Sequence, residues 1–457
     1  MATGHRRSGH DGASSRTTDA ERDRPSRERP VLASPTPTVA GVHEMTEPTL
    51  TSPTDPEAQR LLWRRALGRS GLVYVFSRLC VVVGAAIVAA ELRADENYRL
   101  EFHSWWPGAD PHYAGKVIPK NALRPMIDVL TSWDGLWYLR IVRNGYPHAV
   151  RHNVTYDMND ARAAFFPLYP TLVRWFDLVL PGGDTIAALF LNVLLGAAAV
   201  WIVGLIARDL FGLRVGERAM QLMALFPGSF VLSFAYTEAL LLVLAAGCLW
   251  CLHKRNWWAA GVLAALGTAT RPNGVALVAA CAVAALLAVR RDRDWRALIA
   301  VLLSPIGFLS FQWWIDRHTG QRGIWFRVQT EAWGEGTSFG FTAIRRTVLA
   351  IVNPLSSPTN SITLITVASL LLMVWFTRRH PLPAPMLAFS TAIVLFMLVP
   401  ETVTARPRFL YTAFPLLISS AAWLEEDERG WWPYAVAACA AGLVGLTALY
   451  GVYGAIP

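Results

Sequence analysis

Long apolar runs separated by short polar turns dominate the chain from about residue 71 onward. The first run, 71–90, is long enough for a helix to cross a bilayer, which takes about 20 apolar residues. Ten further runs follow it, and we expect each of them to form a span: 185–207, 220–234, 238–252, 257–269, 274–289, 299–315, 362–376, 387–399, 409–422 and 433–450. The pattern therefore predicts an all-α polytopic membrane protein with about 11 transmembrane helices.

Arginines set the predicted orientation of these spans. Arg64, Arg65 and Arg69 precede the first run. Because basic residues are retained on the cytoplasmic side, the chain before this run is expected in the cytoplasm. Residues 91–184 then form a large first extracytoplasmic loop that carries interfacial helices, and residues 316–345 form a second large external loop.

The segment 165–180 decides whether this topology holds. It is apolar but contains Pro170, Arg174 and Asp177, so it is either a poor span or a helix lying on the membrane surface. Placing it at the surface puts the later arginine clusters on the cytoplasmic side, whereas a span would reverse every turn after it. We therefore expect 165–180 to lie along the interface.

Composition adds a tail and excludes several protein classes. Residues 1–60 are rich in Arg, Ser, Thr, Pro and Asp, which predicts a disordered cytoplasmic tail before a transmembrane domain over 61–457; Met45 is an alternative start. The net charge of +9 comes mostly from this tail and from clusters between apolar runs, so it indicates membrane orientation and no nucleic-acid partner. All five cysteines lie within apolar runs, which favours neither disulfides nor a zinc site.

Asp134 begins the most distinctive polar stretch, in the first external loop. The residues that follow it have an apolar arc on a helical wheel, which includes Trp137, Tyr138 and Ile141 and lies opposite polar residues such as Arg140. This pattern predicts an amphipathic helix lying in the membrane surface. Asp134 is either a helix cap or a carboxylate available for chemistry at the mouth of the membrane protein.

The predicted topology gathers further polar residues at the same outer boundary: Asp134, Glu238, Arg271, Asn273, Glu401, Arg406 and Arg408. The positive-inside rule disfavours arginines on this side, and guanidinium groups bind phosphate with two parallel hydrogen bonds. An anionic ligand at the outer leaflet would explain them. Ion pairing between these residues, turn formation and anchoring at lipid headgroups are the structural alternatives.

A metal site is not indicated. Asp292 and Asp294 form a D-x-D, but the predicted topology places it in a cytoplasmic turn. Asp157, Asp160 and Glu238 could supply metal ligands only if the fold brings them together.

Several segments in order resemble the PIG-V-type mannosyltransferases, integral membrane glycosyltransferases of the GT-C class. The residues that carry the resemblance lie within about 65–425: W-D-G-L-W-Y at 133–138, F-F-P-L-Y-P at 165–170, Y-T-E at 236–238, R-P-N-G at 271–274 and R-F at 408–409. The resemblance implies a GT-C-like helix bundle, and the preference for Arg over Lys indicates a bacterial member. It also implies a protein of the cytoplasmic membrane, with the active site facing the extracytoplasmic side.

The resemblance implies an activity as well. Such enzymes transfer mannose from a polyprenyl-phosphate-linked donor to an acceptor hydroxyl with inversion, and no cofactor is expected. Asp134 matches the family's general base. Arg408, Arg406 and Arg271 are then candidates for the donor phosphate. The candidates for sugar or acceptor binding are Trp133, Tyr138, Glu238 and Asn273, and the acceptor is a glycolipid, a glycan or a protein.

Two other functions compete with this one. A transporter or flippase of a lipid-linked sugar would also need arginines at a headgroup, but transporters commonly show two similar halves, and the large first loop has no counterpart in the second half. A non-catalytic membrane scaffold explains the spans but not the outer arginines.

Overall fold

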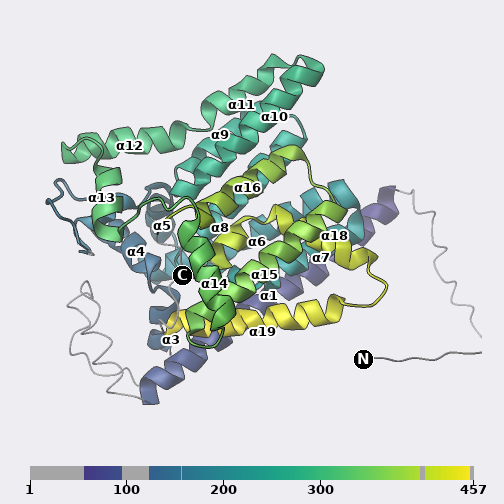
Figure 1. The fold of residues 1–457 in the computed structure, drawn as a ribbon, viewed down its shortest axis with the longest axis horizontal. Coiled ribbons are helices and arrows are strands. Elements are labelled where there is room, and N and C mark those ends of the chain that lie inside the picture. Colours follow the sequence, from purple (N-terminus) through teal and green to yellow (C-terminus); the bar gives the residue numbers. More distant parts are fainter. Residues whose placement is uncertain (1–55, 95–122, 156, 402–406, 453–457) are drawn as a thin grey trace, which may run out of the picture. The chain divides into compact units, whose positions relative to one another are not determined.

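The computed structural model describes residues 56–94, 123–155, 157–401 and 407–452 (Figure 1). Most of the predicted tail and Arg406 lie outside the described residues. Within them the secondary structure is helical, with one isolated antiparallel bridge between Thr337 and Pro400. The chain is thus all-α, as its apolar pattern predicts.

Six helical segments of the described residues are long and apolar enough to cross a membrane: 56–90, 184–211, 272–292, 295–319, 358–379 and 432–451. They correspond to α1 (Pro56–Ala94), α6 (Asp184–Phe211), α10 (Ala276–Asp292), the pair α11 (Leu298–Leu303) and α12 (Ile306–Thr319), α15 (Pro358–Arg379) and α19 (Trp432–Gly451). Shorter apolar helices are α8 (Glu238–His253), α9 (Trp257–Thr268) and α16 (Ala384–Leu398). The protein is therefore a multi-pass membrane protein, and the count of 11 spans stays a prediction.

The described part of residues 91–184, the predicted first extracytoplasmic loop, contains short helices. These are α3 (Leu123–Leu130), α4 (Asp134–Asn144), the 3-10 turn η1 (Ala161–Ala164) and α5 (Leu168–Asp177). With 10 residues, α5 is about 15 Å long, half of the ~30 Å apolar thickness of a bilayer. It is too short to span, as the predicted topology requires.

Residues 316–345, the predicted second external loop, are also partly helical. They hold α13 (Ile324–Trp333) and the start of α14 (Phe341–Val352). Gly323 and Gly334 flank α13, and both adopt positive φ angles (65° and 60°) that favour glycine.

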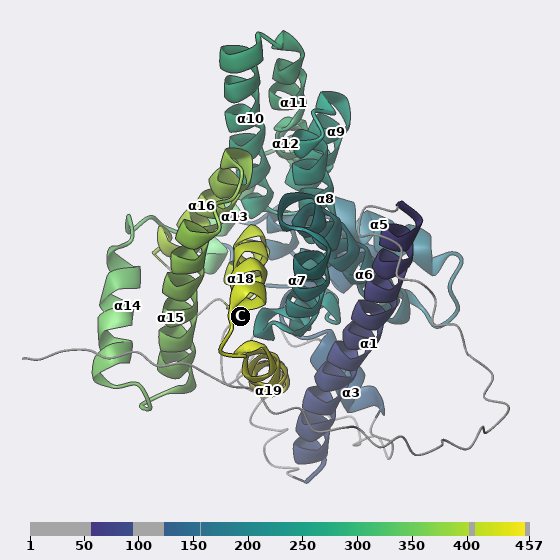
Figure 2. The same ribbon diagram turned by 90° about the vertical axis from the view of Figure 1, so that its right-hand side faces the viewer.

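A buried turn between two antiparallel helices, α7 (Leu213–Leu225) and α8, lies at the centre of the bundle: the start of α7 and the end of α8 both lie at the C-terminal end of α6, where Lys254 pairs with Asp209. After α7 the chain forms a 3-10 turn, η2 (Pro227–Leu232), and α8 begins only at Glu238. In Figure 2, α7 lies next to α18 (Pro415–Glu426) in the middle of the bundle, between α1 and α15. Phe230, Phe234 and Tyr236, all in this turn, are fully buried. The turn therefore lies in the core, and its backbone groups that make no helical hydrogen bond must find partners in the neighbouring helices.

Gly307 controls the close packing of α12 against α9, and we expect its replacement to destabilise the protein. A β-carbon at this position would overlap the carbonyl oxygen of Ala265 and lie 2.7 Å from the amide nitrogen of Ala269. Gly307→Ala should lower the free energy of unfolding by about 1–3 kcal/mol, the usual cost of overpacking. The measurement is the thermal midpoint in detergent. Gly68→Ala on α1 is the control, because its β-carbon would meet no atom within 4 Å. Equal midpoints for the two variants would contradict the prediction.

Candidate active site

Four charged side chains from separate parts of the chain form one continuous cluster, here called the charged quartet: Asp134, Glu238, Arg271 and Arg408. Asp134 and Glu238 are the first residues of α4 and α8, Arg271 precedes the 3-10 turn η3 (Pro272–Val275), and Arg408 lies in α17 (Pro407–Thr412). Nη1 of Arg408 lies 2.7 Å from Oδ2 of Asp134 and 3.4 Å from Oε1 of Glu238. Nη1 of Arg271 contacts the same Glu238 oxygen. The ion-pair contacts therefore run from Asp134 to Arg408, from Arg408 to Glu238, and from Glu238 to Arg271.

The members of the quartet differ in their access to the outside. The side chain of Glu238 is 1% exposed and those of both arginines are 10% exposed, whereas 27% of the Asp134 side chain is exposed. Two carboxylates balance two guanidinium groups, which makes the burial of four charges tolerable. Asp134 is therefore the carboxylate of the quartet that a substrate can reach.

Asp134 is not a capping residue in this structure. Trp133 occupies the N-cap position of α4 and makes no side-chain cap hydrogen bond, and Asp134 follows as the first helical residue. A negative charge in the first turn is favoured by the helix dipole. The carboxylate itself is bound by Arg408, so the helix orients it without using it as a cap.

Aromatic rings surround the arginines. The guanidinium of Arg408 lies 5.7 Å from the ring centre of Tyr236 and 5.6 Å from that of Phe409. The guanidinium of Arg271 lies 5.6 Å from the centre of the same Phe409 ring. Ring faces attract cations, and they also exclude water from the arginine stems. Both guanidinium groups are thereby held in place independently of a ligand.

Several polar atoms around the quartet are buried without a hydrogen-bond partner. In the described part of the chain these include Nε of Arg408, Nε of Arg271 and both amide atoms of Asn273, a residue that is 3% exposed. Buried polar groups are normally paired, and each unpaired one calls for an explanation. Three of these four atoms are hydrogen-bond donors, which suits an anionic ligand.

Arg78, a residue that was not predicted to have a role, supports the turn between α7 and α8 that places Glu238. It lies in the first span, is 8% exposed, and donates to the carbonyl oxygen of Ser229 (2.8 Å), the hydroxyl of Ser233 (2.9 Å) and the carbonyl oxygen of Ala224 (3.1 Å). It thus satisfies backbone carbonyl groups at the end of α7 and in the turn that follows it. The sequence feature that could have revealed it is a single charge inside an apolar run, because a charge within a membrane is costly unless it is paired or has a function.

Asn192 on α6 is a second such residue, and we expect its loss to displace the quartet. Its side-chain nitrogen donates to the carbonyl oxygens of Phe234 and Tyr236, the latter at 2.7 Å. Asn192→Leu leaves both carbonyl groups buried and unpaired, and each should lower the free energy of unfolding by about 1–3 kcal/mol. We therefore expect a lower thermal midpoint and weaker activity. Asn360→Leu, at an exposed helix start on α15, should change the midpoint far less; a similar shift for both would contradict this role.

Tyr138 and Trp133, the aromatic candidates for sugar binding, make contacts within the protein. The Tyr138 ring packs edge-on against Phe165 and Tyr169, and its hydroxyl lies 3.3 Å from that of Thr237. Burial raises the pKa of Tyr138 well above its ordinary value, so the hydroxyl stays protonated. The indole nitrogen of Trp133 donates to the carbonyl oxygen of Tyr450 (3.1 Å). Their role in sugar binding stays a prediction.

The structure does not bring Asp157 and Asp160 to Glu238. Both aspartates pair with Arg151 instead, Asp160 at 2.7 Å. Among the described residues, no group of three or more His, Cys, Asp or Glu side chains is placed to hold a metal ion. The two aspartates thus stabilise their own loop through Arg151.

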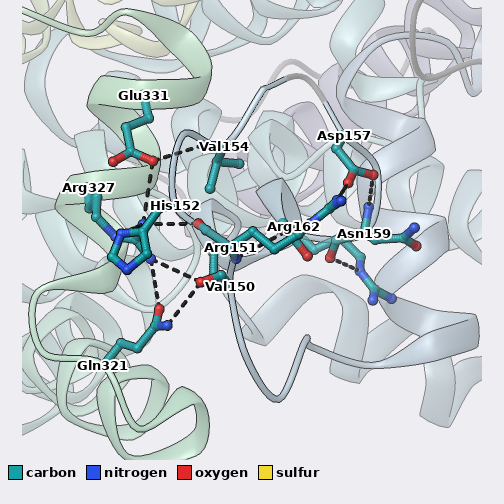
Figure 3. A network of polar contacts seen from close by, with 11 residues as sticks. Val150, Arg151, His152, Val154, Asp157, Asn159, Arg162, Gln321, Arg327 and Glu331 are labelled. Carbon is teal, nitrogen blue, oxygen red and sulfur yellow. Dashed lines mark hydrogen bonds and ion pairs between the residues drawn. The ribbon is translucent and has the colours of Figure 1, made fainter.

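That loop is fixed to α13 by a polar network (Figure 3). Gln321 donates to the carbonyl oxygen of Val150 (2.9 Å), Arg327 donates to that of Arg151 (3.0 Å), and Glu331 accepts from the amide of Val154 (2.9 Å). The two segments that were predicted as external loops, 91–184 and 316–345, are thus hydrogen-bonded to each other.

Two sequence comparisons find that parts of the chain are similar to mannosyltransferases. A family model described as dolichyl-phosphate-mannose-protein mannosyltransferase matches residues 167–315, which include Glu238 and Arg271 but neither Asp134 nor Arg408. A GPI alpha-1,6-mannosyltransferase 2 of Cricetulus griseus is 27% identical over 206 residues. That alignment covers 43% of this chain and 40% of the relative, so the chain spans less than half the length of this curated relative.

Solved structures of two membrane enzymes are also similar. ArnT from Cupriavidus metallidurans, bound to undecaprenyl phosphate, is 16% identical with a TM-score of 0.44, over 66% of this chain and 56% of that chain. The oligosaccharyltransferase of Archaeoglobus fulgidus, in a complex with zinc and sulfate, is 14% identical with a TM-score of 0.37, over 82% of this chain and 52% of that chain.

Proposed function

We propose that the protein is a mannosyltransferase that uses a polyprenyl-phosphate-linked mannose donor and transfers the sugar to an acceptor hydroxyl on the extracytoplasmic side of the cytoplasmic membrane. One observation carries this proposal: the quartet couples a reachable carboxylate, Asp134, to a buried arginine, Arg408, beside unpaired hydrogen-bond donors. A base beside an anion site is what an inverting transfer from a lipid phosphate requires. Similarity to mannosyltransferases over part of the chain supports mannose as the sugar.

The donor phosphate is held by the arginines. The free Nε groups of Arg408 and Arg271 are the donors we assign to it, and the unpaired amide of Asn273 is assigned to the sugar or acceptor. Arg406, outside the described residues, is two positions from Arg408 and is assigned to the same phosphate. The quartet is neutral by itself, so these extra donors, rather than net charge, supply the binding.

The transfer step uses Asp134 as the base. Its carboxylate takes the proton of the acceptor hydroxyl while that oxygen forms a bond to the anomeric carbon of mannose. The bond between that carbon and the phosphate oxygen breaks on the opposite side, which inverts the configuration. The lipid phosphate leaves with the electron pair as an anion, and Arg408 stabilises the charge that develops on it.

The purified protein in detergent, supplied with radiolabelled polyprenyl-phosphate-mannose and extracted membrane lipids and glycans, tests the proposal. We expect labelled product and stoichiometric release of polyprenyl phosphate without any second compartment, and no product from GDP-mannose. Movement of the donor across vesicle membranes without transfer would contradict the proposal and support a flippase. Lipid and glycan profiles of a deletion strain then identify the acceptor as the precursor that accumulates.

A further inference from the structure

The residue before Asp134 has an unusual backbone. Trp133 adopts φ 56° and ψ −121°, a conformation that side chains with a β-carbon rarely take. Strained residues persist only where their surroundings hold them, and they concentrate at functional sites. This conformation sets the direction in which α4 begins, and with it the position of the Asp134 carboxylate.

The turn that contains Trp133 is held from two sides. Within the turn, the Ser132 hydroxyl donates to the carbonyl oxygen of Val129 (2.7 Å), and the Leu136 amide donates to that of Trp133 (3.1 Å). From outside, the Trp133 indole donates to the carbonyl oxygen of Tyr450 in the last turn of α19 (3.1 Å). The second contact joins residues 317 positions apart, so α19 is the distant support of the strained turn.

The last turn of α19 is itself fixed closely. A β-carbon on Gly451 would lie 2.9 Å from Val88 on α1 and 3.0 Å from Val129 on α3, so the glycine allows the three helices to meet. Tyr450 is fully buried, and its ring centre lies 4.3 Å from that of Phe230 in η2. The last turn of α19 is therefore packed against α1, α3 and η2, and its Tyr450 carbonyl is bound by Trp133.

We infer that the last turn of α19 positions the catalytic base: the Tyr450 carbonyl holds Trp133 in its strained conformation, and Trp133 thereby holds Asp134 against Arg408. This inference rests on the proposed function. It makes Trp133 a positioning residue, and it gives a role to a helix that lies outside the residues matched by the mannosyltransferase family model. The chemistry is that of a preorganised base, whose misplacement by about 1 Å can cost 100-fold in rate.

Trp133→Phe tests the inference, because it keeps an aromatic ring but removes the N–H donor. We expect kcat for mannosyl transfer to fall roughly ten- to 100-fold while KM for polyprenyl-phosphate-mannose stays within about two-fold, since the phosphate donors are untouched. Gly451→Ala should lower kcat in the same way by pushing α19 from Val88 and Val129. Gly445→Ala, on the same helix with no atom within 4 Å of its β-carbon, should leave kcat unchanged.

The double variant Trp133→Phe/Gly451→Ala separates positioning from general damage. If both changes remove one support, the double variant should lose no more than the stronger single variant, because coupled sites are not additive. Wild-type kcat in Trp133→Phe would overturn the inference, as would a loss confined to KM or to the thermal midpoint. If the wild-type protein itself transfers no sugar, the proposed function fails; if it does and Trp133→Phe matches it, only this inference fails.

Discussion

Replacing Asp134 with asparagine should abolish mannosyl transfer while the protein still folds and accumulates in the membrane. The amide has nearly the shape of the carboxylate but cannot take a proton from the acceptor hydroxyl. General-base catalysis contributes about 10²–10⁴-fold, so we expect kcat to fall by at least 100-fold. Arg408 keeps its contact with Glu238 at 3.4 Å, so the site should stay assembled.

The measurement is single-turnover release of polyprenyl phosphate by purified protein at equal concentration. Asp177→Asn is the matched control, because it makes the same chemical change at the end of α5, away from the quartet. We expect wild-type rates from the control. Near-normal transfer by Asp134→Asn would remove Asp134 from the role of base.

Replacing Arg408 with alanine should weaken binding of the donor and slow the chemical step. Arg408 is the shared partner of Asp134 and Glu238, so its loss leaves two carboxylates without a cation between them. A positioned group that stabilises a departing anion is worth about 10²–10³-fold in kcat. We therefore expect a fall in kcat of that order together with a raised KM for the donor. Because breaking a buried ion pair is destabilising, the thermal midpoint should also fall.

Arg408→Lys distinguishes charge from geometry. Lysine restores a positive charge but not the planar group that lies between the rings of Tyr236 and Phe409, so we expect partial recovery of the midpoint and little recovery of kcat. Arg345→Ala, an exposed arginine on α14, is the control and should leave both unchanged. Full activity in Arg408→Ala would instead favour a protein whose outer arginines only anchor it to lipid.

The apolar pattern predicted much of the fold because long runs without charge have few alternatives to a helix. All nine apolar helices of the described residues that are candidates by length and composition fall on predicted runs. Short helices at the surface were harder. The predicted external loop 316–345 contains α13, which the glycines on both sides conceal, since glycine is typical of loops as well as of helix ends.

The predicted topology placed Asp134 and Arg408 at one membrane boundary but could not show their contact. They are 274 positions apart, and only the fold shows that they touch. Arg78 and Asn192 were missed because each was absorbed into an apolar run as a tolerated polar residue. The strained backbone of Trp133 has no signal in residue type, because strain of this kind is imposed by distant packing.

The central claim is that Asp134 and Arg408 touch but act on different groups, the acceptor hydroxyl and the donor phosphate. Equilibrium binding of polyprenyl phosphate to the wild-type, Asp134→Asn and Arg408→Ala proteins tests it most directly. We predict that Asp134→Asn binds the lipid at least as tightly as the wild type, because Arg408 is released from a competing carboxylate, and that Arg408→Ala binds it at least about ten-fold more weakly, the loss of roughly 1.4 kcal/mol. Equal loss of binding in both variants, or normal binding by Arg408→Ala, would contradict this division of roles.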